Sequence, residues 1–287
     1  RGRITFSTPM LWVTAFFTTF AIGGMTGVMM AIPPVDFQTH NSLFLVAHFH
    51  NVIIGGVLFG FFAGLSYWCP KVFGFSLDEK RGKYAFWFWV VGFYVAFMPL
   101  YVLGLMGVMR RTQHYTNLAY QPYFVIAAIG SVLIFIGLLF QVSMVIYSIK
   151  HREELRDKTG DPWDARTLEW STSSPAPFYN FAHIPTVNQI DDYWYEKEKW
   201  QDGIKPKPPE YTDIHMPKNT AFGFIIAICA GLTGFSIVWH MLIPGIVGFI
   251  AIIASVILKC FNTDVDYYVK ADEVRKIEMA HMKEATS

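Results

Sequence analysis

The chain has 287 residues, of which 53% are hydrophobic, 17% are aromatic and only 16% are charged, a composition too apolar for an ordinary soluble domain. Its formal net charge is +1, with 23 basic and 22 acidic side chains, so it lacks the basic field by which proteins attract nucleic acid. These values indicate a protein that works in a lipid bilayer and exclude nucleic acid as a partner.

Apolar runs long enough to cross a membrane follow one another along the chain. A hydrocarbon core about 30 Å thick needs about 20 mostly apolar residues in one helix. Six runs qualify: Met10–Ile32, Ser42–Cys69, Tyr84–Met109, Tyr123–Ile149, Ala221–Trp239 and Ile243–Phe261. The predicted fold class is therefore all-α, a polytopic bundle with about six transmembrane spans.

Two polar segments divide the chain into four predicted parts. Residues 150–218 are rich in Pro, Trp, Tyr and charge and have no helical period suited to lipid, and the tail has an amphipathic stretch around Ala271–Lys283. We expect a four-helix core in 1–149, a polar loop in 150–218, two further spans in 219–262 and a polar tail in 263–287. Because the chain begins without methionine or a signal pattern, we also expect a fragment of a longer polypeptide.

The distribution of Lys and Arg predicts the orientation in the membrane. If six spans alternate, Arg1, Arg3, the connection at 70–83, the loop 150–218 and the tail all fall on one side, which should be the cytoplasm. The opposite side receives 33–40, 110–121 and 240–242, where the only basic residues are Arg110 and Arg111. This adjacent pair is an exception to the rule and needs an explanation.

Two histidines, His48 and His50, lie two residues apart inside the second apolar run. Ionisable groups within a span are costly and usually functional. At about 100° per residue the two rings point about 200° apart, so they cannot bind one metal from the same helix face but can serve two centres. Because a neutral imidazole is a common axial ligand of haem iron, the spacing favours one helix between two haems. The alternative is two histidines hydrogen-bonded to neighbouring helices.

A haem would also need partners for its propionates. Arg binds carboxylates through a planar fork, and Arg110 and Arg111 are predicted to lie on the side where the helix of His48 begins. The alternative is a pair of solvated loop residues. Asp36 and His40 precede the same helix on that side and can complete a polar cluster for propionates, water or exiting protons.

The string from His40 to Asn51 resembles the tenth helix of subunit I in haem-copper terminal oxidases. The likeness continues in the same order through Arg110 and Arg111 and is closest to the bo-type ubiquinol oxidase branch. Further matching segments are Asp161–Trp163, Arg166–Trp170, Ser173–Pro175, Tyr179–Phe181, Ile214–Asn219 and Asp264–Tyr268. The chain thus looks like the C-terminal part of a large subunit that has a core of twelve helices.

This resemblance implies specific roles for the histidine pair. His48 would be the proximal ligand of the high-spin haem, of type o or a, at the oxygen site. His50 would be an axial ligand of the low-spin haem b, and Phe49 would lie between the haems. The ligands of copper B are expected upstream of this fragment, so the chain alone should be inactive.

The resemblance also assigns the polar residues near the start of that helix. Arg110 and Arg111 would hold the propionates, and Asp36 with His40 would belong to the polar region above the high-spin haem. Cytochrome c oxidases of the family carry Asp where this sequence has Asn41, and that Asp helps to bind magnesium. Because Asn41 lacks the carboxylate, the magnesium site should be altered or empty, which fits the quinol branch.

The parent protein implied by this resemblance oxidises ubiquinol, reduces oxygen to water and pumps protons in the inner membrane of a bacterium. Its partners would be oxidase subunits of types II, III and IV. One alternative is subunit I of a cytochrome c oxidase. An alternative of another class is a haem-free transporter or scaffold subunit, in which His48 and His50 would be structural or relay protons.

Overall fold

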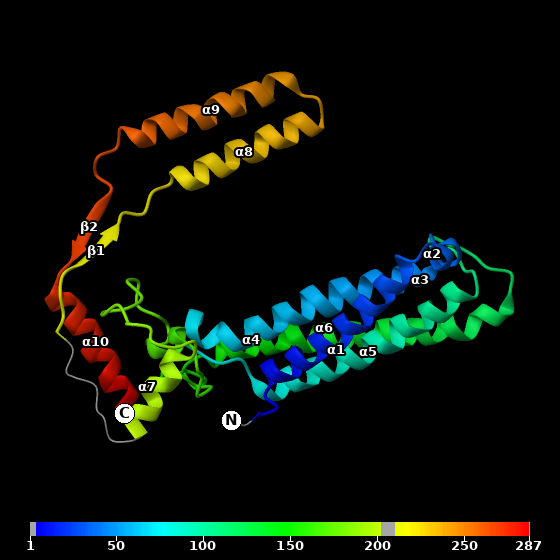
Figure 1. Ribbon diagram of the computed structural model, residues 1–287, viewed down its shortest axis with the longest axis horizontal. Coiled ribbons are helices and arrows are strands. Elements are labelled where there is room, and N and C mark those ends of the chain that lie inside the picture. Colours follow the sequence, from blue (N-terminus) through cyan, green and yellow to red (C-terminus); the bar gives the residue numbers. More distant parts are fainter. Residues whose placement is uncertain (1–3, 202–209, 287) are drawn as a thin grey trace. The chain divides into compact units, whose positions relative to one another are not determined.

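A computed structural model describes residues 4–201 and 210–286 of the chain, and Figure 1 shows that most of it is helical. It contains two compact units, which are described separately below. The larger unit comprises Arg1–Ala176 and Asp191–Lys197, and the smaller comprises Pro177–Ile190 and Glu198–Ser287. Arg1, Arg3 and positions 202–209 of the expected loop lie outside the described residues. The four parts expected from the sequence remain a prediction.

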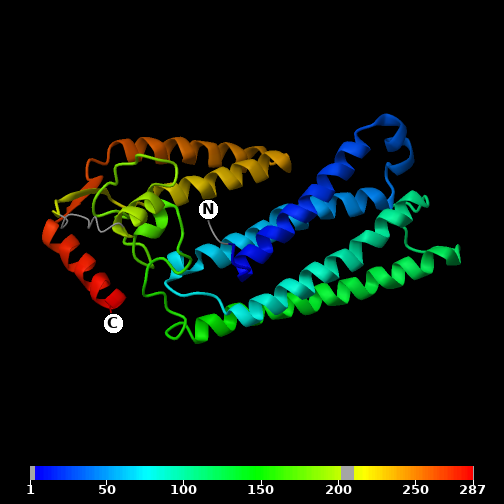
Figure 2. The ribbon, with the colours of Figure 1, turned by 60° about the horizontal axis from the view of Figure 1, so that its bottom comes forward.

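Four long apolar helices form the larger unit and lie lengthwise beside one another (Figure 2). The helices are α1 (Thr8–Met30), the continuous run of α3 (Leu43–His50), η1 (Asn51–Leu58) and α4 (Phe59–Phe73), α5 (Glu79–Leu105) and α6 (Gln121–Lys150). Short helices lie in the connections: α2 (Pro33–Thr39), η2 (Leu118–Tyr120), η3 (Leu168–Ser171) and α7 (Asp192–Gln201). All four long helices have the length and hydropathy of membrane spans, as the sequence predicted.

Side chains and glycine fix where these helices begin and end. The Ser42 hydroxyl accepts a hydrogen bond from the Phe44 amide at 3.1 Å, and the Asp78 carboxylate accepts one from the Arg81 amide at 2.8 Å. Each satisfies an amide that has no partner within the first turn of its helix. Gly74, with φ of 79°, ends α4 in the left-handed conformation that favours glycine.

Small residues let the helices approach closely. A Cβ added to Gly130 of α6 would lie 2.2 Å from the Ala96 nitrogen of α5, and one added to Gly104 of α5 would lie 2.1 Å from the Phe44 nitrogen of α3. In lipid, van der Waals packing at such small residues drives helix association. The glycines therefore set the distances of α5 from both α6 and the histidine-bearing helix.

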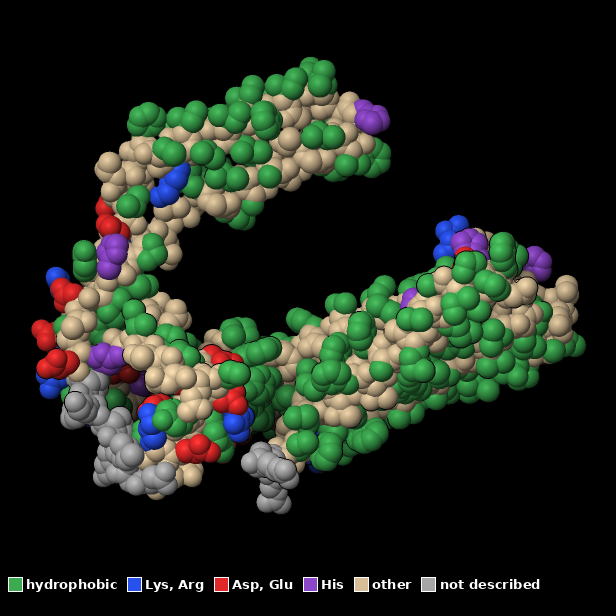
Figure 3. All heavy atoms as spheres, in the orientation of Figure 1, with side chains coloured by type: hydrophobic (Ala, Val, Ile, Leu, Met, Phe, Trp, Pro, Cys, Tyr) green, Lys and Arg blue, Asp and Glu red, His purple; other side chains and the backbone are tan. Residues whose placement is uncertain are grey.

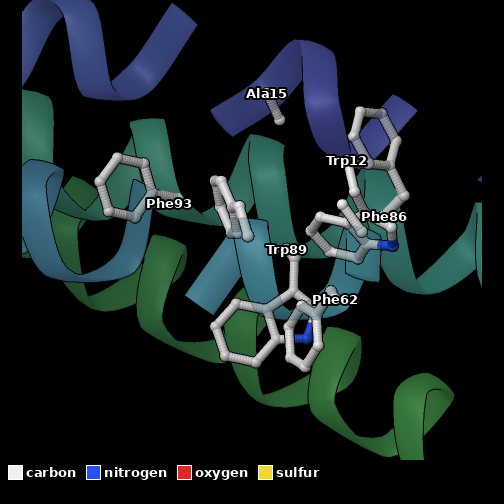
Figure 4. Close-up of a cluster of buried hydrophobic side chains, with 8 residues drawn as sticks. Trp12, Ala15, Phe62, Phe86, Trp89 and Phe93 are labelled. Carbon is white, nitrogen blue, oxygen red and sulfur yellow. The ribbon is translucent and has the colours of Figure 1, made fainter. Parts of the chain in front are cut away.

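An aromatic cluster joins α1, α4 and α5 (Figure 4). Trp12 has 0% of its surface exposed, and its ring lies 4.9 Å from that of Phe62 and 5.1 Å from that of Phe86, the latter edge-on. Phe62 also contacts Trp89 edge-on at 5.7 Å. Edge-to-face pairs stabilise such contacts beyond the area that they bury, so this cluster fixes the bundle around the helix that carries the histidines.

The polar segment after α6 folds against the end of α4 within the larger unit. The Trp163 indole donates a hydrogen bond to the Tyr67 carbonyl at 2.9 Å. The Lys71 ammonium, whose residue is 8% exposed, donates to the carbonyls of Thr172 at 2.7 Å and Ser173 at 3.1 Å. Three of the matching segments of the sequence, Asp161–Trp163, Arg166–Trp170 and Ser173–Pro175, thus lie in a loop that is fixed to a membrane helix.

A lysine of α7 completes this loop. Lys197 donates to Asp161 at 2.5 Å and to Asp164 at 2.8 Å. Burial lowers the pKa of Lys197, but the hydrogen bonds to Asp161 and Asp164 outweigh it and raise the pKa above its ordinary value. Lys197 therefore remains charged at neutral pH and holds the turn together.

The smaller unit contains an apolar hairpin made of α8 (Phe222–Val238) and α9 (Leu242–Cys260). Five helices of the described chain, including α9, are long and apolar enough to cross a membrane, whereas α8 is apolar but has only 17 residues. The sequence predicted six spans. Helix α8 is one residue shorter at each end than the predicted run Ala221–Trp239, which leaves it about 26 Å long at 1.5 Å per residue.

The smaller unit contains a two-stranded ribbon, whereas the sequence predicted an all-α fold. Strand β1 (Ile214–Pro217) pairs antiparallel with β2 (Asp266–Val269), so two of the matching segments of the sequence lie side by side. Beside the ribbon, the Lys270 ammonium and the Ala271 amide donate to Asp213, and these hydrogen bonds lower the pKa of its carboxyl. Helix α10 (Ala271–Thr286) follows, where the sequence predicted an amphipathic stretch.

Candidate functional site

His48 and His50 lie in the last turn of α3, where the helix changes character. At Asn51 the backbone passes from α-helical to the π-helical segment η1, which continues to Leu58. Short π-helical segments within α-helices are frequent at functional sites. The two histidines therefore stand at a point where the geometry of the membrane helix departs from the ordinary.

The surroundings of His50 fix the orientation of its ring. Its Nδ1 lies 2.7 Å from the Val46 carbonyl, which can only accept, so Nδ1 donates this hydrogen bond and Nε2 is the nitrogen left for a ligand. The ring stacks on Phe97 of α5 at 4.3 Å and lies 4.3 Å from the neighbouring Phe49 ring. A metal-binding histidine typically donates its second ring N–H in this way, which leaves Nε2 as the ligand nitrogen.

The His48 ring is oriented by a hydrogen bond to a different helix. Its Nδ1 lies 3.0 Å from the Thr26 hydroxyl of α1, and that hydroxyl donates its single hydrogen to the Gly23 carbonyl at 2.9 Å. The hydroxyl must therefore accept from Nδ1, which leaves Nε2 of His48 free. Both alternatives of the sequence analysis meet here, because the histidines are hydrogen-bonded within the bundle and each retains a ligand nitrogen. The donor set fits two haem irons.

Glycines of α1 make room for this arrangement. A Cβ added to Gly27 would lie 2.8 Å from Cε1 of His48, and one added to Gly23 would lie 3.1 Å from Cβ of Asn51. The backbone of α1 thus passes directly against the His48 ring. A larger side chain at Gly27 would displace the ring or the helix.

The loop after α5 is hydrogen-bonded to the start of the histidine helix. The Arg110 amide donates to the Asn41 carbonyl at 2.9 Å, and the Leu43 amide donates to the Val108 carbonyl at 2.9 Å. Arg110 is half-buried and Arg111 is exposed with φ of 69°. Among the residues that the structure describes, neither guanidinium forms an ion pair. Both remain available to a carboxylate ligand.

Asp36 and His40 lie at the same end of α3. They pair across one turn at the end of α2, with 3.6 Å between His40 Nδ1 and Asp36 Oδ2. Figure 3 shows charged and histidine side chains gathered at this end of the larger unit, in contrast to the apolar surface of its helices. The structure thus brings Asp36, His40 and Arg110 to one polar end of the unit, and the roles expected for them remain a prediction.

Within the described ranges, no group of three or more His, Cys, Asp or Glu side chains could hold a metal ion.

Sequence reasoning missed the residues that surround His48. Thr26, Tyr101 and Gly27 contact this ring or its hydrogen-bond partner, but each type is common in membrane helices. Gly23 and Gly27 were the one available signal, because glycines four residues apart mark a helix face that another element approaches closely.

Comparisons with known proteins support the resemblance found in the sequence. Residues 1–133 match the family model described as Cytochrome C and Quinol oxidase polypeptide I. The chain is 53% identical over 283 residues to a cytochrome bo(3) ubiquinol oxidase subunit 1 of Buchnera aphidicola, covering 99% of this chain. It is 51% identical over 287 residues to a probable cytochrome c oxidase subunit 1 of Bradyrhizobium diazoefficiens, covering 100% of this chain. The chain spans 43% of the length of each of these relatives.

Among solved structures, the chain is similar to a haem-copper terminal oxidase dimer determined by cryo-electron microscopy. The identity is 29%, the TM-score is 0.46, and the match covers 49% of this chain and 26% of that one.

Proposed function

Because this chain belongs, through residues 1–133, to the cytochrome c and quinol oxidase polypeptide I family, we propose that the whole protein is the catalytic large subunit of a proton-translocating ubiquinol oxidase. The family is one of haem-copper oxidases, and the chain is a multi-pass membrane segment. One observation carries the proposal. His48 and His50 lie on one membrane helix, and each has Nδ1 hydrogen-bonded and Nε2 free.

In this proposal His48 would hold the iron of the high-spin haem, of type o or a, and His50 would hold the iron of the low-spin haem b. When bound, the haems together with copper B carry electrons and reduce oxygen to water. The residues of this chain hold the two ligand nitrogens on a single rigid element. Phe49, whose ring lies 4.3 Å from that of His50, would stand between the two haems.

The polar end of the bundle would bind the propionates. Arg110 and Arg111 offer guanidinium groups that match carboxylates, and the backbone bond from Arg110 to Asn41 ties the first of them to the histidine helix. Asp36 and His40, paired at 3.6 Å, would belong to the polar region above the high-spin haem. Their exposure to solvent would let them exchange protons with water.

The remainder of the assembly would come from outside this chain. Ligands of copper B would be supplied by the rest of the large subunit, and oxidase subunits of types II, III and IV would complete the complex. We place it in the inner membrane of a bacterium, where it would meet ubiquinol in the bilayer and oxygen. On its own, this chain would be inactive.

Asn41 favours quinol over cytochrome c as the electron donor. It adopts a left-handed backbone with φ of 55°, which asparagine tolerates well, and its side chain carries no charge for a divalent cation. One relative bears the name of a probable cytochrome c oxidase, so oxidation of cytochrome c is the second candidate function.

The test uses the whole oxidase purified from its membrane. We expect oxygen uptake with a soluble ubiquinol analogue and a background rate with reduced cytochrome c, together with a haem Soret band. Uptake with cytochrome c alone would establish the second candidate. A purified complex without haem would contradict both and support a transporter or scaffold.

A further inference from the structure

We propose that Thr26 and Tyr101 position the His48 ring, so that the hydroxyl of Thr26 accepts a hydrogen bond from the Nδ1–H group and thereby sets the direction and basicity of Nε2. The inference rests on the proposed role of His48 as a haem ligand. It assigns a function to two residues of α1 and α5 that bear no charge.

The geometry centres on one oxygen atom. The Thr26 Oγ1 lies 2.9 Å from the Gly23 carbonyl oxygen, 3.0 Å from Nδ1 of His48 and 3.0 Å from the Tyr101 hydroxyl. These three partners come from α1, α3 and α5, so one hydroxyl connects three membrane helices. The Tyr101 ring is itself held edge-on against Phe44 at 4.8 Å.

Counting hydrogens gives each bond its direction. A hydroxyl has one hydrogen to donate and two lone pairs, and a carbonyl only accepts. The Thr26 hydrogen therefore goes to Gly23, and both lone pairs accept, one from Tyr101 and one from His48. Every site on the oxygen is used, and the lone pair that faces His48 has a fixed direction.

This bond acts on the nitrogen at the other side of the ring. When a metal-binding histidine donates its second N–H to an acceptor, the ring orientation is fixed and the ligand nitrogen becomes more basic. Axial ligation and hydrogen bonding to the ligand are the means by which a protein tunes haem iron. Thr26 would therefore strengthen the bond from His48 to iron, and Tyr101 would hold the Thr26 hydroxyl in place.

A second threonine and tyrosine pair provides a matched comparison. Thr19 of α1 and Tyr94 of α5 are also 3.0 Å apart, and they have the same sequence separation of 75 residues as Thr26 and Tyr101. The two pairs thus form successive bridges between parallel α1 and α5. Of these two bridges, only the one at Thr26 contacts a histidine. Removal of the Thr19–Tyr94 bridge therefore loses the same type of hydrogen bond between α1 and α5 without disturbing His48.

The experiment compares Thr26→Val, Thr26→Ser and Thr19→Val in the whole purified oxidase by resonance Raman spectroscopy of the reduced high-spin haem. We expect Thr26→Val to move the iron–histidine stretching band to lower frequency and to weaken retention of this haem about tenfold. Thr26→Ser and Thr19→Val should leave the band at the wild-type position. Tyr101→Phe should shift it in the same direction by a smaller amount.

The outcomes distinguish this inference from the function on which it rests. If Thr26→Val and Tyr101→Phe keep the wild-type band while His48→Ala loses it, the positioning role is wrong and the ligand assignment stands. If His48→Ala also keeps the band, the ligand assignment itself is wrong. Should Thr26→Val not assemble, an unshifted band in Tyr101→Phe would still overturn the proposal.

Discussion

At the scale of single residues, the direction of each imidazole ring depends on the group that its Nδ1 contacts. The Nδ1 of His50 bonds to its own helix, at the Val46 carbonyl, whereas that of His48 bonds to Thr26 on another helix. The direction of the His50 ring is therefore set locally. The direction of the His48 ring depends on how α1 packs against α3, which makes it the more sensitive of the two to changes elsewhere.

Substitution of Gly27 by alanine tests this dependence. The added Cβ would lie 2.8 Å from Cε1 of His48, closer than carbon atoms normally approach, so the ring or the helix must shift and the contact between Nδ1 and Thr26 would be disturbed. We expect loss of about 90% of the carbon-monoxide-sensitive haem signal in the whole oxidase, given the tenfold effects typical of second-sphere changes. Gly24→Ala is the control, because no atom lies within 4 Å of a Cβ there. An unchanged signal in Gly27→Ala would show that the ring has room.

The histidine pair and the arginine pair could be predicted from the sequence, because placing ionisable side chains in or beside a membrane span costs free energy and such residues are therefore rare there. Thr26 and Tyr101 could not be predicted. Their types are ordinary in a span, and their convergence on one atom depends on the register between α1 and α5, which a single sequence does not reveal.

At the scale of elements, the span prediction worked because length and hydropathy are local properties. The helices of the larger unit lie within a few residues of the predicted runs, although α5 begins at Glu79 rather than Tyr84. That earlier start is polar and is fixed by Asp78, which caps the helix. The ribbon of β1 and β2 could not be predicted, because its strands lie about 50 residues apart and pair only in three dimensions.

Replacement of Lys71 by methionine tests how the loop after α6 is held. The ammonium donates to the carbonyls of Gly160, Thr172 and Ser173 at 2.9, 2.7 and 3.1 Å, and methionine would leave these oxygens without a donor. We expect the unfolding free energy to fall by about 2–4 kcal/mol, seen as a lower Tm of the purified oxidase.

The control for this change is Lys83→Met. Lys83 pairs with Glu79 at 3.2 Å, but both side chains are about half exposed, so its loss should cost no more than about 1 kcal/mol. Equal Tm values for the two variants would contradict the anchoring role of Lys71.

At the scale of the whole molecule, the number of membrane crossings depends on α8. Four helices of the larger unit and α9 have the length of spans, and α8 with 17 residues lies just below it. If α8 crosses, the turn at Met241 faces the side opposite the polar segment after α6. The distribution of Lys and Arg along the sequence predicts that this segment lies in the cytoplasm.

Cysteine labelling with a membrane-impermeant maleimide tests this topology. In a background where Cys69, Cys229 and Cys260 are replaced by serine, Met241→Cys should react in intact spheroplasts, and Glu154→Cys only in inverted vesicles. Reaction of both from the same side would show that α8 does not cross.

The central claim is that one helix serves two haems, and optical spectra of the whole oxidase test it most directly. Reduced-minus-oxidised spectra would be recorded with and without carbon monoxide on membranes that contain His48→Ala or His50→Ala. We predict loss of the carbon-monoxide-sensitive signal in His48→Ala and loss of the low-spin band in His50→Ala. Unchanged spectra in both variants would contradict the claim and make the two histidines packing residues of a membrane bundle.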